Sequence, residues 1–410
     1  MVKRILQPGI VGKSLMVLFV AFGSGPVSLQ TANAQAAGPE APMFEVDLMW
    51  PKPLPNHWVL GMVIGVSVDA HDNIWIVHRN DSTEPKEVYE TWKPPAANCC
   101  MTAPPVLEFN PAGDLIKAWG GPGRGYDWPT SLHGITVDYQ GNIWIGSNGR
   151  GDTKGHSSGN EDKGRFLDNQ LLKFTPDGKF IMQIGHPGQS KGSNDTENLQ
   201  GPAKMFIDPT TNELYVADGY GNRRVIVFDA TTGAYKRHWG AYGRKPDDTD
   251  PGKYDPDTAI DQQFRTPVHC VMLAHDGLLY VCDRKNDRIQ VFKTDGTFVK
   301  EKIIEKSTGG DGATWDIAFS KGPEQKYIYL ADGANEEVHI LLRDSLDVLT
   351  SFGDGGRQPG QFYAVHSIAT DSKGNLYTTE TYRGQRVQRF IFKGIGPVTT
   401  AHEGVLWPKK

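Results

Sequence analysis

The segment HGITVDYQGNIWIGSN, residues 133–148, decides the fold of this chain. Apolar residues recur at every second position, at Ile135 and Val137 and again at Ile143 and Ile145. This period of two is typical of β-strands with one buried face, and a Gly-Asn pair between the two runs indicates a tight turn. The segment therefore predicts a β-hairpin.

The same strand-turn-strand pattern occurs in six segments along the chain. Several copies continue with a third and a fourth strand, as in RVIVFDATTGAYKRHWG, residues 224–240. Six copies of four strands predict an all-β chain folded as a six-bladed β-propeller, which we place at residues 63–396. The paired segments begin at Gly65, His133, Ala203, His269, Trp315 and His366.

Every second copy of the repeat carries a histidine at its opening position. In a propeller the first strand of each blade lines a central channel, so three histidines from alternate blades point to one place. Three neutral imidazoles around one point form a metal site with one open position, as in catalytic zinc sites. We expect zinc, although copper, iron and nickel also accept imidazole. The histidines are His133, His269 and His366, and the other copies have Ile64, Ala203 and Trp315.

Long polar insertions rich in glycine and proline separate several repeats. Loops of this length in a compact fold usually carry function or are disordered. Most of these insertions begin at strand ends that we expect to lie at the same end of the channel as the histidines. They are predicted to be long loops on one face of the propeller, forming either a rim or lid or plain surface loops. The main ones are 80–105, 149–168, 188–200 and 242–263.

The N-terminus has the order of a secretory signal peptide. Lys3 and Arg4 precede a short apolar stretch at 15–22, and small-residue A-x-A sites follow at 32–36. We therefore predict a signal peptide at residues 1–36 and an exported mature chain, periplasmic or secreted, with no membrane span. Residues 37–62 are predicted to be an N-terminal extension and residues 397–410 a C-terminal tail.

Composition and charge give no indication of a nucleic-acid partner, and the sequence alone does not decide how all four cysteines are paired. The formal net charge is −5 with both signs mixed, and no basic stripe suggests a nucleic-acid partner. Cys270 and Cys282 flank a predicted hairpin turn and are expected opposite each other. Cys99 and Cys100 are adjacent, and they can be bridged, free or paired with another chain.

Three residues stand where second strands end and the chain emerges at a face of the propeller. Arg79 and Arg284 there can hold a carboxylate through a bidentate fork, and Tyr220 beside a metal can have its pKa lowered and act as a base. These three depart from a polar pattern that repeats with the blades and that we interpret as structural. That pattern comprises Asp218, Asp283, Asp332, Asn222, Asn286, Asn335, Arg224 and Arg288.

At these residues the chain resembles a known family. The blades resemble NHL-type repeats, and the site motifs resemble those of peptidyl-α-hydroxyglycine α-amidating lyase from about residue 65 to 392. The zinc histidines of that family match SLHGITVD, TPVHCVML and YAVHSIAT, its catalytic tyrosine matches ADGYGNRR, and its two arginines match VHRND and CDRKNDRIQVF. The residues so matched are His133, His269, His366, Tyr220, Arg79 and Arg284.

The resemblance implies a reaction, the cleavage of a peptidyl-α-hydroxyglycine into a peptide amide and glyoxylate. In that scheme zinc on the three histidines polarises the substrate oxygen and Tyr220 takes the hydroxyl proton. Arg79 and Arg284 would hold the substrate carboxylate and support the tyrosinate.

The chain also departs from the family pattern. A family methionine is replaced by Ala364, and a family disulfide cysteine by Gly221. The residue after the third histidine is a calcium-binding aspartate in the family and Ser367 here, which argues against a structural Ca²⁺. The resemblance leaves the substrate open, because the hydroxylase that makes it in the family is not part of this sequence: we expect a peptide or small molecule with a carboxylate, either a carbinolamide or a different compound.

Two other functions fit the same pattern. An exported NHL-type propeller without catalysis would be a binding or scaffold protein with a protein partner, because fold alone does not settle function. A lactonase-like hydrolase would centre calcium on carboxylates and amides, and the histidines argue against it.

Overall fold

The computed structural model describes residues 39–149 and 167–398, all within one unit, Gly38–Lys410. These residues form six four-stranded antiparallel sheets, with a short parallel pair of β2 (Trp58–Val59) and β5 (Met101–Thr102) beside them. The predicted signal peptide, most of the 149–168 insertion and almost all of the C-terminal tail lie outside the described residues. Among the described helices, none has the length and apolarity needed to cross a membrane.

Blades are numbered here in chain order. Blade 1 consists of β3 (Met62–Val68), β4 (Ile74–Arg79), β6 (Val106–Phe109) and β7 (Leu115–Trp119). Blade 2 consists of β8 (Leu132–Val137), β9 (Ile143–Ser147), β10 (Leu171–Phe174) and β11 (Phe180–Ile184). Blade 3 consists of β12 (Pro202–Ile207), β13 (Glu213–Asp218), β14 (Arg224–Asp229) and β15 (Tyr235–Trp239).

Blade 4 consists of β16 (Val268–Leu273), β17 (Leu278–Asp283), β18 (Arg288–Lys293) and β19 (Phe298–Ile303). Blade 5 consists of β20 (Asp316–Phe319), β21 (Tyr327–Asp332), β22 (Glu337–Leu342) and β23 (Val348–Phe352). Blade 6 consists of β24 (Val365–Thr370), β25 (Leu376–Glu380), β26 (Arg386–Pro397) and β1 (Glu40–Val46). The described helices are single 3₁₀ turns: η1 (Asn80–Ser82), η2 (Pro85–Glu87), η3 (Tyr89–Thr91), η4 (Ala241–Gly243) and η5 (Arg284–Asn286).

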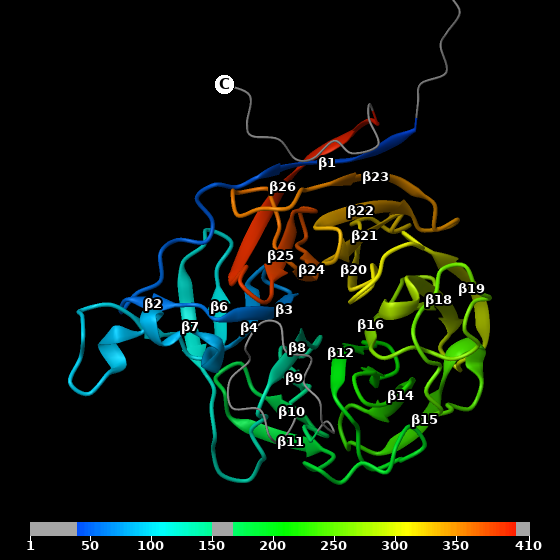
Figure 1. The fold of residues 1–410 in the computed structure, drawn as a ribbon, viewed down its shortest axis with the longest axis horizontal. Helices are drawn as coiled ribbons and strands as arrows, with labels where there is room; N and C mark the ends of the chain where they lie inside the picture. The colour runs from blue at the N-terminus through cyan, green and yellow to red at the C-terminus, as the bar shows by residue number, and fades with distance from the viewer. Residues whose placement is uncertain (1–38, 150–166, 399–410) are drawn as a thin grey trace, which may run out of the picture. The chain divides into compact units, whose positions relative to one another are not determined.

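The first strands of neighbouring blades contact one another in order, and the first strand of blade 6 contacts that of blade 1, which closes the ring (Figure 1). The six-bladed β-propeller predicted from the repeat is therefore confirmed. The core lies between adjacent blades, where one aromatic residue per second strand is at most 2% exposed. Burying such rings between sheets is the main apolar contribution to the fold. These aromatic residues are Trp75, Trp144, Tyr215, Tyr280, Tyr329 and Tyr377.

The ring closes by pairing the two ends of the chain. β1 lies antiparallel to β26 and supplies the outermost strand of blade 6 (Figure 1). Phe44 on β1 packs its ring against Tyr329, Phe352 and Phe392, with centroids 5.3 to 5.9 Å apart. Residues 40–46, which the sequence assigned to an N-terminal extension, are thus an integral part of the propeller.

The repeating polar residues fasten insertions to blades. Arg224 and Asp218 form an ion pair of 2.8 Å with both side chains fully buried, and Arg224 also donates to the carbonyls of Ser193 and Asn198 in the preceding loop. Arg288 pairs with Asp283 in the same way at 2.6 Å. Because a buried charge is tolerated only when paired and hydrogen-bonded, these residues have a structural role, as the repeat indicated.

All four cysteines are bridged. Cys270 and Cys282 stand opposite each other on β16 and β17 and form a disulfide, as the hairpin predicted. Cys99 and Cys100 form a disulfide between adjacent residues. The first bridge covalently joins the strand that carries His269 to its neighbour.

His78 anchors the start of the 80–105 loop beside Arg79. Its ring is fully buried, accepts a hydrogen bond at Nδ1 from the backbone N–H of Gly61 (3.1 Å) and donates from Nε2 to the carbonyl of Pro104 (3.0 Å). An amide donor on one side and a carbonyl acceptor on the other require the neutral ring. Burial lowers the pKa of His78 to about 4.

This low pKa predicts a loss of stability in acid. The unfolded chain takes up a proton near the ordinary histidine pKa and the folded chain only near 4, so stability from His78 is present above about pH 6.5 and declines below it. Between pH 7 and pH 5 the loss is about 2 kcal/mol. Urea unfolding at both pH values should show this drop reduced by that amount in His78→Gln and unchanged in His275→Gln, an exposed turn residue. An equal drop in wild type and His78→Gln would contradict the assignment.

Candidate metal centre

A β-bulge places each of the three histidines in the channel. The ladder between the first and second strands shifts register between Leu132 and Ile135, between Val268 and Cys270, and between Val365 and Ser367. A bulged residue leaves the ladder and its side chain is redirected, a device common beside functional sites. The register shift occurs at the histidine in all three blades, so the same backbone irregularity orients all three side chains.

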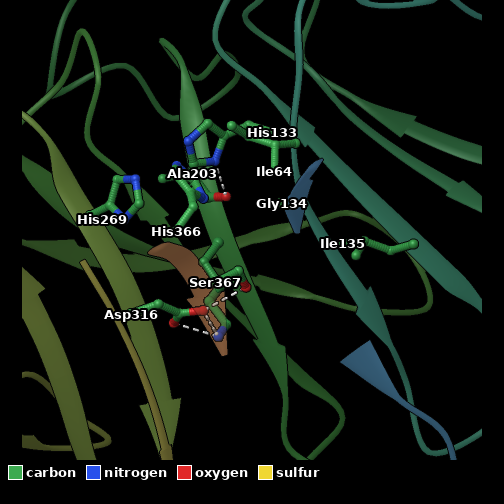
Figure 2. Close-up of a pocket in the computed structure, with 10 residues that line it drawn as sticks. Ile64, His133, Gly134, Ile135, Ala203, His269, Asp316, His366 and Ser367 are labelled. Carbon is green, nitrogen blue, oxygen red and sulfur yellow. Dashed lines mark hydrogen bonds and ion pairs between the residues drawn. The ribbon is translucent and has the colours of Figure 1, made fainter. Parts of the chain in front are cut away.

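The imidazoles of His133, His269 and His366 meet at the centre of the propeller (Figure 2). Their ligand nitrogens all lie within 4.8 Å of one another, and the ring centroids are 4.8 to 5.0 Å apart. Each residue is at most 3% exposed. The grouping predicted from alternate repeats is therefore present in the structure.

The blades between the histidines set their orientation. Nδ1 of His133 donates to the carbonyl of Ala203 (2.9 Å) and Nδ1 of His269 to the carbonyl of Trp315 (2.6 Å). His366 differs from the other two: the backbone of Ile64 acts on its ring, but its buried Nδ1 makes no hydrogen bond within the described residues. A proton held on Nδ1 leaves the Nε2 lone pair free for a metal ion, and a carbonyl in this place is a usual support for a histidine ligand.

Burial lowers the pKa of all three rings well below the ordinary histidine value, and the nearby charges of Arg79 and Arg284 act in the same direction. The cluster is therefore neutral at physiological pH. Three neutral, oriented and buried imidazoles fit a zinc-type ion with a further position open to substrate.

Tyr220 lies against this cluster, two residues beyond the end of β13. Its hydroxyl is 2.8 Å from Nε2 of His133 and 3.1 Å from Nε2 of His269. Burial raises the pKa of Tyr220, while the charges of Arg284 and Arg79 lower it. In the chain alone the net direction is upward, because exclusion of water outweighs the two guanidinium groups. The lowered pKa expected from the sequence applies to Tyr220 beside a bound metal ion and stays a prediction.

The two candidate arginines lie near Tyr220, close enough for their charges to act on its hydroxyl. Arg79 ends β4, is 8% exposed, and donates to the carbonyl of Leu132 (3.0 Å) and to Oδ1 of Asn148 (2.8 Å). Arg284 directly follows β17, is 4% exposed, and is 3.3 Å from the Tyr220 hydroxyl. The structure thus brings all six predicted site residues together, with two buried positive charges beside neutral imidazoles.

Arg284 has a second set of contacts that the sequence did not predict. Its guanidinium lies 4.4 Å from the Trp315 ring centroid and donates to Oδ1 of Asp311 (3.2 Å), whose other oxygen accepts from the Tyr382 hydroxyl (2.9 Å). Tyr382 follows Glu380 by two residues in blade 6, as Tyr220 follows Asp218 in blade 3. That shared position is a signal that could have found Tyr382, whereas Asp311 lies in a loop with no repeat.

Comparisons with known proteins agree with this architecture. No family model matches the chain. Human NHL repeat-containing protein 3 is 24% identical over 391 residues, covering 92% of this chain and 92% of the human protein. Peptidyl-alpha-hydroxyglycine alpha-amidating lyase 1 of Drosophila melanogaster is 24% identical over 379 residues, 84% of this chain and 59% of that protein.

Peptidylglycine alpha-amidating monooxygenase of Rattus norvegicus is 28% identical over 268 residues, 63% of this chain. The match spans 23% of the length of the rat protein. Among solved structures, a streptogramin B lyase aligns with a TM-score of 0.48 at 12% identity over 86% of this chain and 98% of that chain. The chain, a six-bladed β-propeller by its own sheets, is similar in sequence to NHL repeat-containing protein 3 and to the amidating lyase.

The cluster predicts bound metal that depends on its histidines. We expect about one transition-metal ion per purified chain, lost in His133→Ala/His269→Ala because a single imidazole remains. Inductively coupled plasma mass spectrometry measures this directly, with His275→Ala as a control outside the cluster. A wild-type chain that holds no metal even after incubation with zinc would contradict the assignment.

Proposed function

We propose that this chain is a metal-dependent carbon–nitrogen lyase, with zinc as the metal, that splits a carbinolamide carrying a carboxylate into an amide and glyoxylate. The observation that carries the proposal is the position of the Tyr220 hydroxyl, within 3.3 Å of two metal-facing imidazole nitrogens and of Arg284. A base, a metal site and a carboxylate-binding cation then act on one substrate carbon. Similarity to amidating lyases over most of the chain supports the same chemistry.

The substrate carboxylate binds between Arg79 and Arg284. Both guanidinium groups are buried, so a carboxylate that reaches them gains charge-assisted hydrogen bonds with little competition from water. Arg79 is already fixed by Leu132 and Asn148, which reduces the entropy lost on binding. This places the carbon next to the carboxylate near Tyr220.

The reaction needs one proton moved and one bond broken. A zinc ion held by the three histidines would supply positive charge that polarises the substrate hydroxyl oxygen and favours deprotonated Tyr220. Tyr220 removes the hydroxyl proton, the oxygen forms a carbonyl with its carbon, and the C–N bond breaks with its electron pair passing to nitrogen. The proton on Tyr220 then passes to the nitrogen, so the products are the amide and glyoxylate, and Arg284 stabilises the phenolate form of Tyr220 before it takes the proton and after it returns it.

We also propose that the protein acts outside the cytoplasm, after removal of residues 1–36. The two disulfides, Cys99–Cys100 and Cys270–Cys282, are typical of oxidising compartments and support export. The sequence order at the N-terminus is the other support.

A second candidate is a non-catalytic binding propeller. The mutual coverage of 92% with human NHL repeat-containing protein 3 favours it, because that match extends along both chains. In that case the cluster would be structural and the protein would bind a partner without turnover. Assay of glyoxylate release separates the two candidates.

Tyr220→Phe tests the proposed base. Loss of the hydroxyl should lower kcat for an α-hydroxyglycine substrate by at least about 10²-fold, because Tyr220 is the proposed acceptor of the substrate's hydroxyl proton. Metal content and thermal stability should stay close to wild type, and Tyr235→Phe, an exposed tyrosine on β15, should keep full activity. A wild-type rate in Tyr220→Phe would refute this role.

Asp311 is proposed as a positioning residue that holds Arg284 for the substrate carboxylate. Asp311→Asn keeps the shape but removes the charge beside Arg284, and we expect kcat/KM to fall about tenfold, mainly through KM. Asp311→Glu should recover part of the loss, and Asp347→Asn, in the exposed pair with Lys302, should have no effect. An unchanged KM in Asp311→Asn would show that Arg284 is positioned without it.

A further inference from the structure

Below the histidine cluster a second polar layer crosses the channel. It is formed by the residues that directly follow the opening position in three blades: Lys204 on β12, Asp316 on β20 and Ser367 on β24. Figure 2 shows Asp316 and Ser367 beneath the three imidazoles. The layer and the imidazoles line one small pocket.

Lys204 and Asp316 form a buried ion pair in this layer. The Lys204 ammonium is 2.5 Å from Oδ1 and 2.6 Å from Oδ2 of Asp316, and the side chains are 11% and 3% exposed. The lysine comes from blade 3 and the aspartate from blade 5, so the contact spans the channel instead of joining neighbouring strands.

The other hydrogen bonds of Asp316 connect it to a third blade. Oδ1 also accepts from the backbone N–H of Ile317 (2.8 Å), and Oδ2 accepts from the Ser367 hydroxyl (2.7 Å) and the backbone N–H of Ile368 (3.1 Å). The Ser367 oxygen itself accepts from the N–H of Val66 in blade 1 (3.4 Å). Both carboxylate oxygens thus have hydrogen-bond partners, from three blades, and Ser367 links this carboxylate to a fourth blade.

These residues do not fit a calcium ion. Ca²⁺ takes six to eight oxygen ligands, several of them charged. This layer offers one carboxylate whose oxygens already have their partners, a serine in place of a second carboxylate, and an ammonium group that supplies the positive charge. A divalent cation here would face Lys204 at close range, and that repulsion is severe in a buried site.

We propose that Lys204 is a built-in cation that takes the place of a structural calcium at the centre of this propeller, and that the fold is therefore independent of calcium. An ammonium group carried by the chain compensates Asp316 at any concentration of free metal ions. The inference does not depend on the proposed lyase activity, because it concerns only the layer beneath the histidines.

The first test uses calcium and the wild-type chain. Thermal unfolding of the zinc-loaded protein, with and without millimolar calcium chloride, should give melting temperatures that agree within about 1 °C. The purified chain should contain no stoichiometric calcium by mass spectrometry. A rise of several degrees with calcium, or one calcium per chain, would overturn the proposal.

The second test removes the ammonium. Lys204→Met leaves Asp316 buried and unpaired, and the melting temperature should fall by about 5 °C or more. Lys204→Met/Asp316→Leu removes both charges and should recover most of that loss. Lys302→Met, which breaks the exposed pair with Asp347, is the matched control and should change little.

A Lys204→Met chain as stable as wild type would show that the ammonium does not compensate Asp316. If Lys204→Met does not fold, recovery of folding in Lys204→Met/Asp316→Leu would show instead that the ammonium group compensates Asp316. Neither readout involves turnover, so failure of the lyase assay leaves this inference unaffected.

Discussion

The site depends on one recurring interaction, the hydrogen bond from a histidine Nδ1 to a carbonyl of the next blade. His133 donates to Ala203 and His269 donates to Trp315, so these two rings are each oriented by a blade other than their own. The geometry of the cluster is therefore a property of the closed ring. Pairing of β1 with β26 holds that ring shut and so also holds the imidazoles in place.

The channel is arranged in layers of different charge. Neutral imidazoles occupy the middle, with Arg79 and Arg284 on the Tyr220 side and the compensated pair of Lys204 and Asp316 below. The lower pair is neutral overall, whereas Asp311 compensates only one of the two arginines on the side where a carboxylate substrate would bind, so positive charge remains there. Burial lowers the pKa of the imidazoles and so keeps them available to a metal ion.

Much of this could be predicted from the sequence because the chain is a repeat. A period-two pattern that recurs six times defines the blades, and alignment of the copies brings the histidines together without any structure. The strand-end position gave Arg79, Tyr220 and Arg284. Tyr382 stands at the corresponding strand end of blade 6, two residues after Glu380, and was not among the predicted site residues.

Other features arise from contacts that no repeat encodes. β1 has no hairpin partner in the sequence and pairs with a strand at the opposite end of the chain, so residues 40–46 looked like an extension. Lys204 and Asp316 are 112 residues apart and meet only across the closed ring. The pKa of Tyr220 depends on burial, which the spacing of residues does not show.

The most direct test of the central claim is anomalous diffraction at the zinc absorption edge from crystals of the zinc-loaded chain. The account predicts one strong peak per chain, about 2.0–2.1 Å from Nε2 of His133, His269 and His366. A peak bound elsewhere, or no peak at the cluster in zinc-soaked crystals, would show that the three histidines are channel residues and not a metal centre.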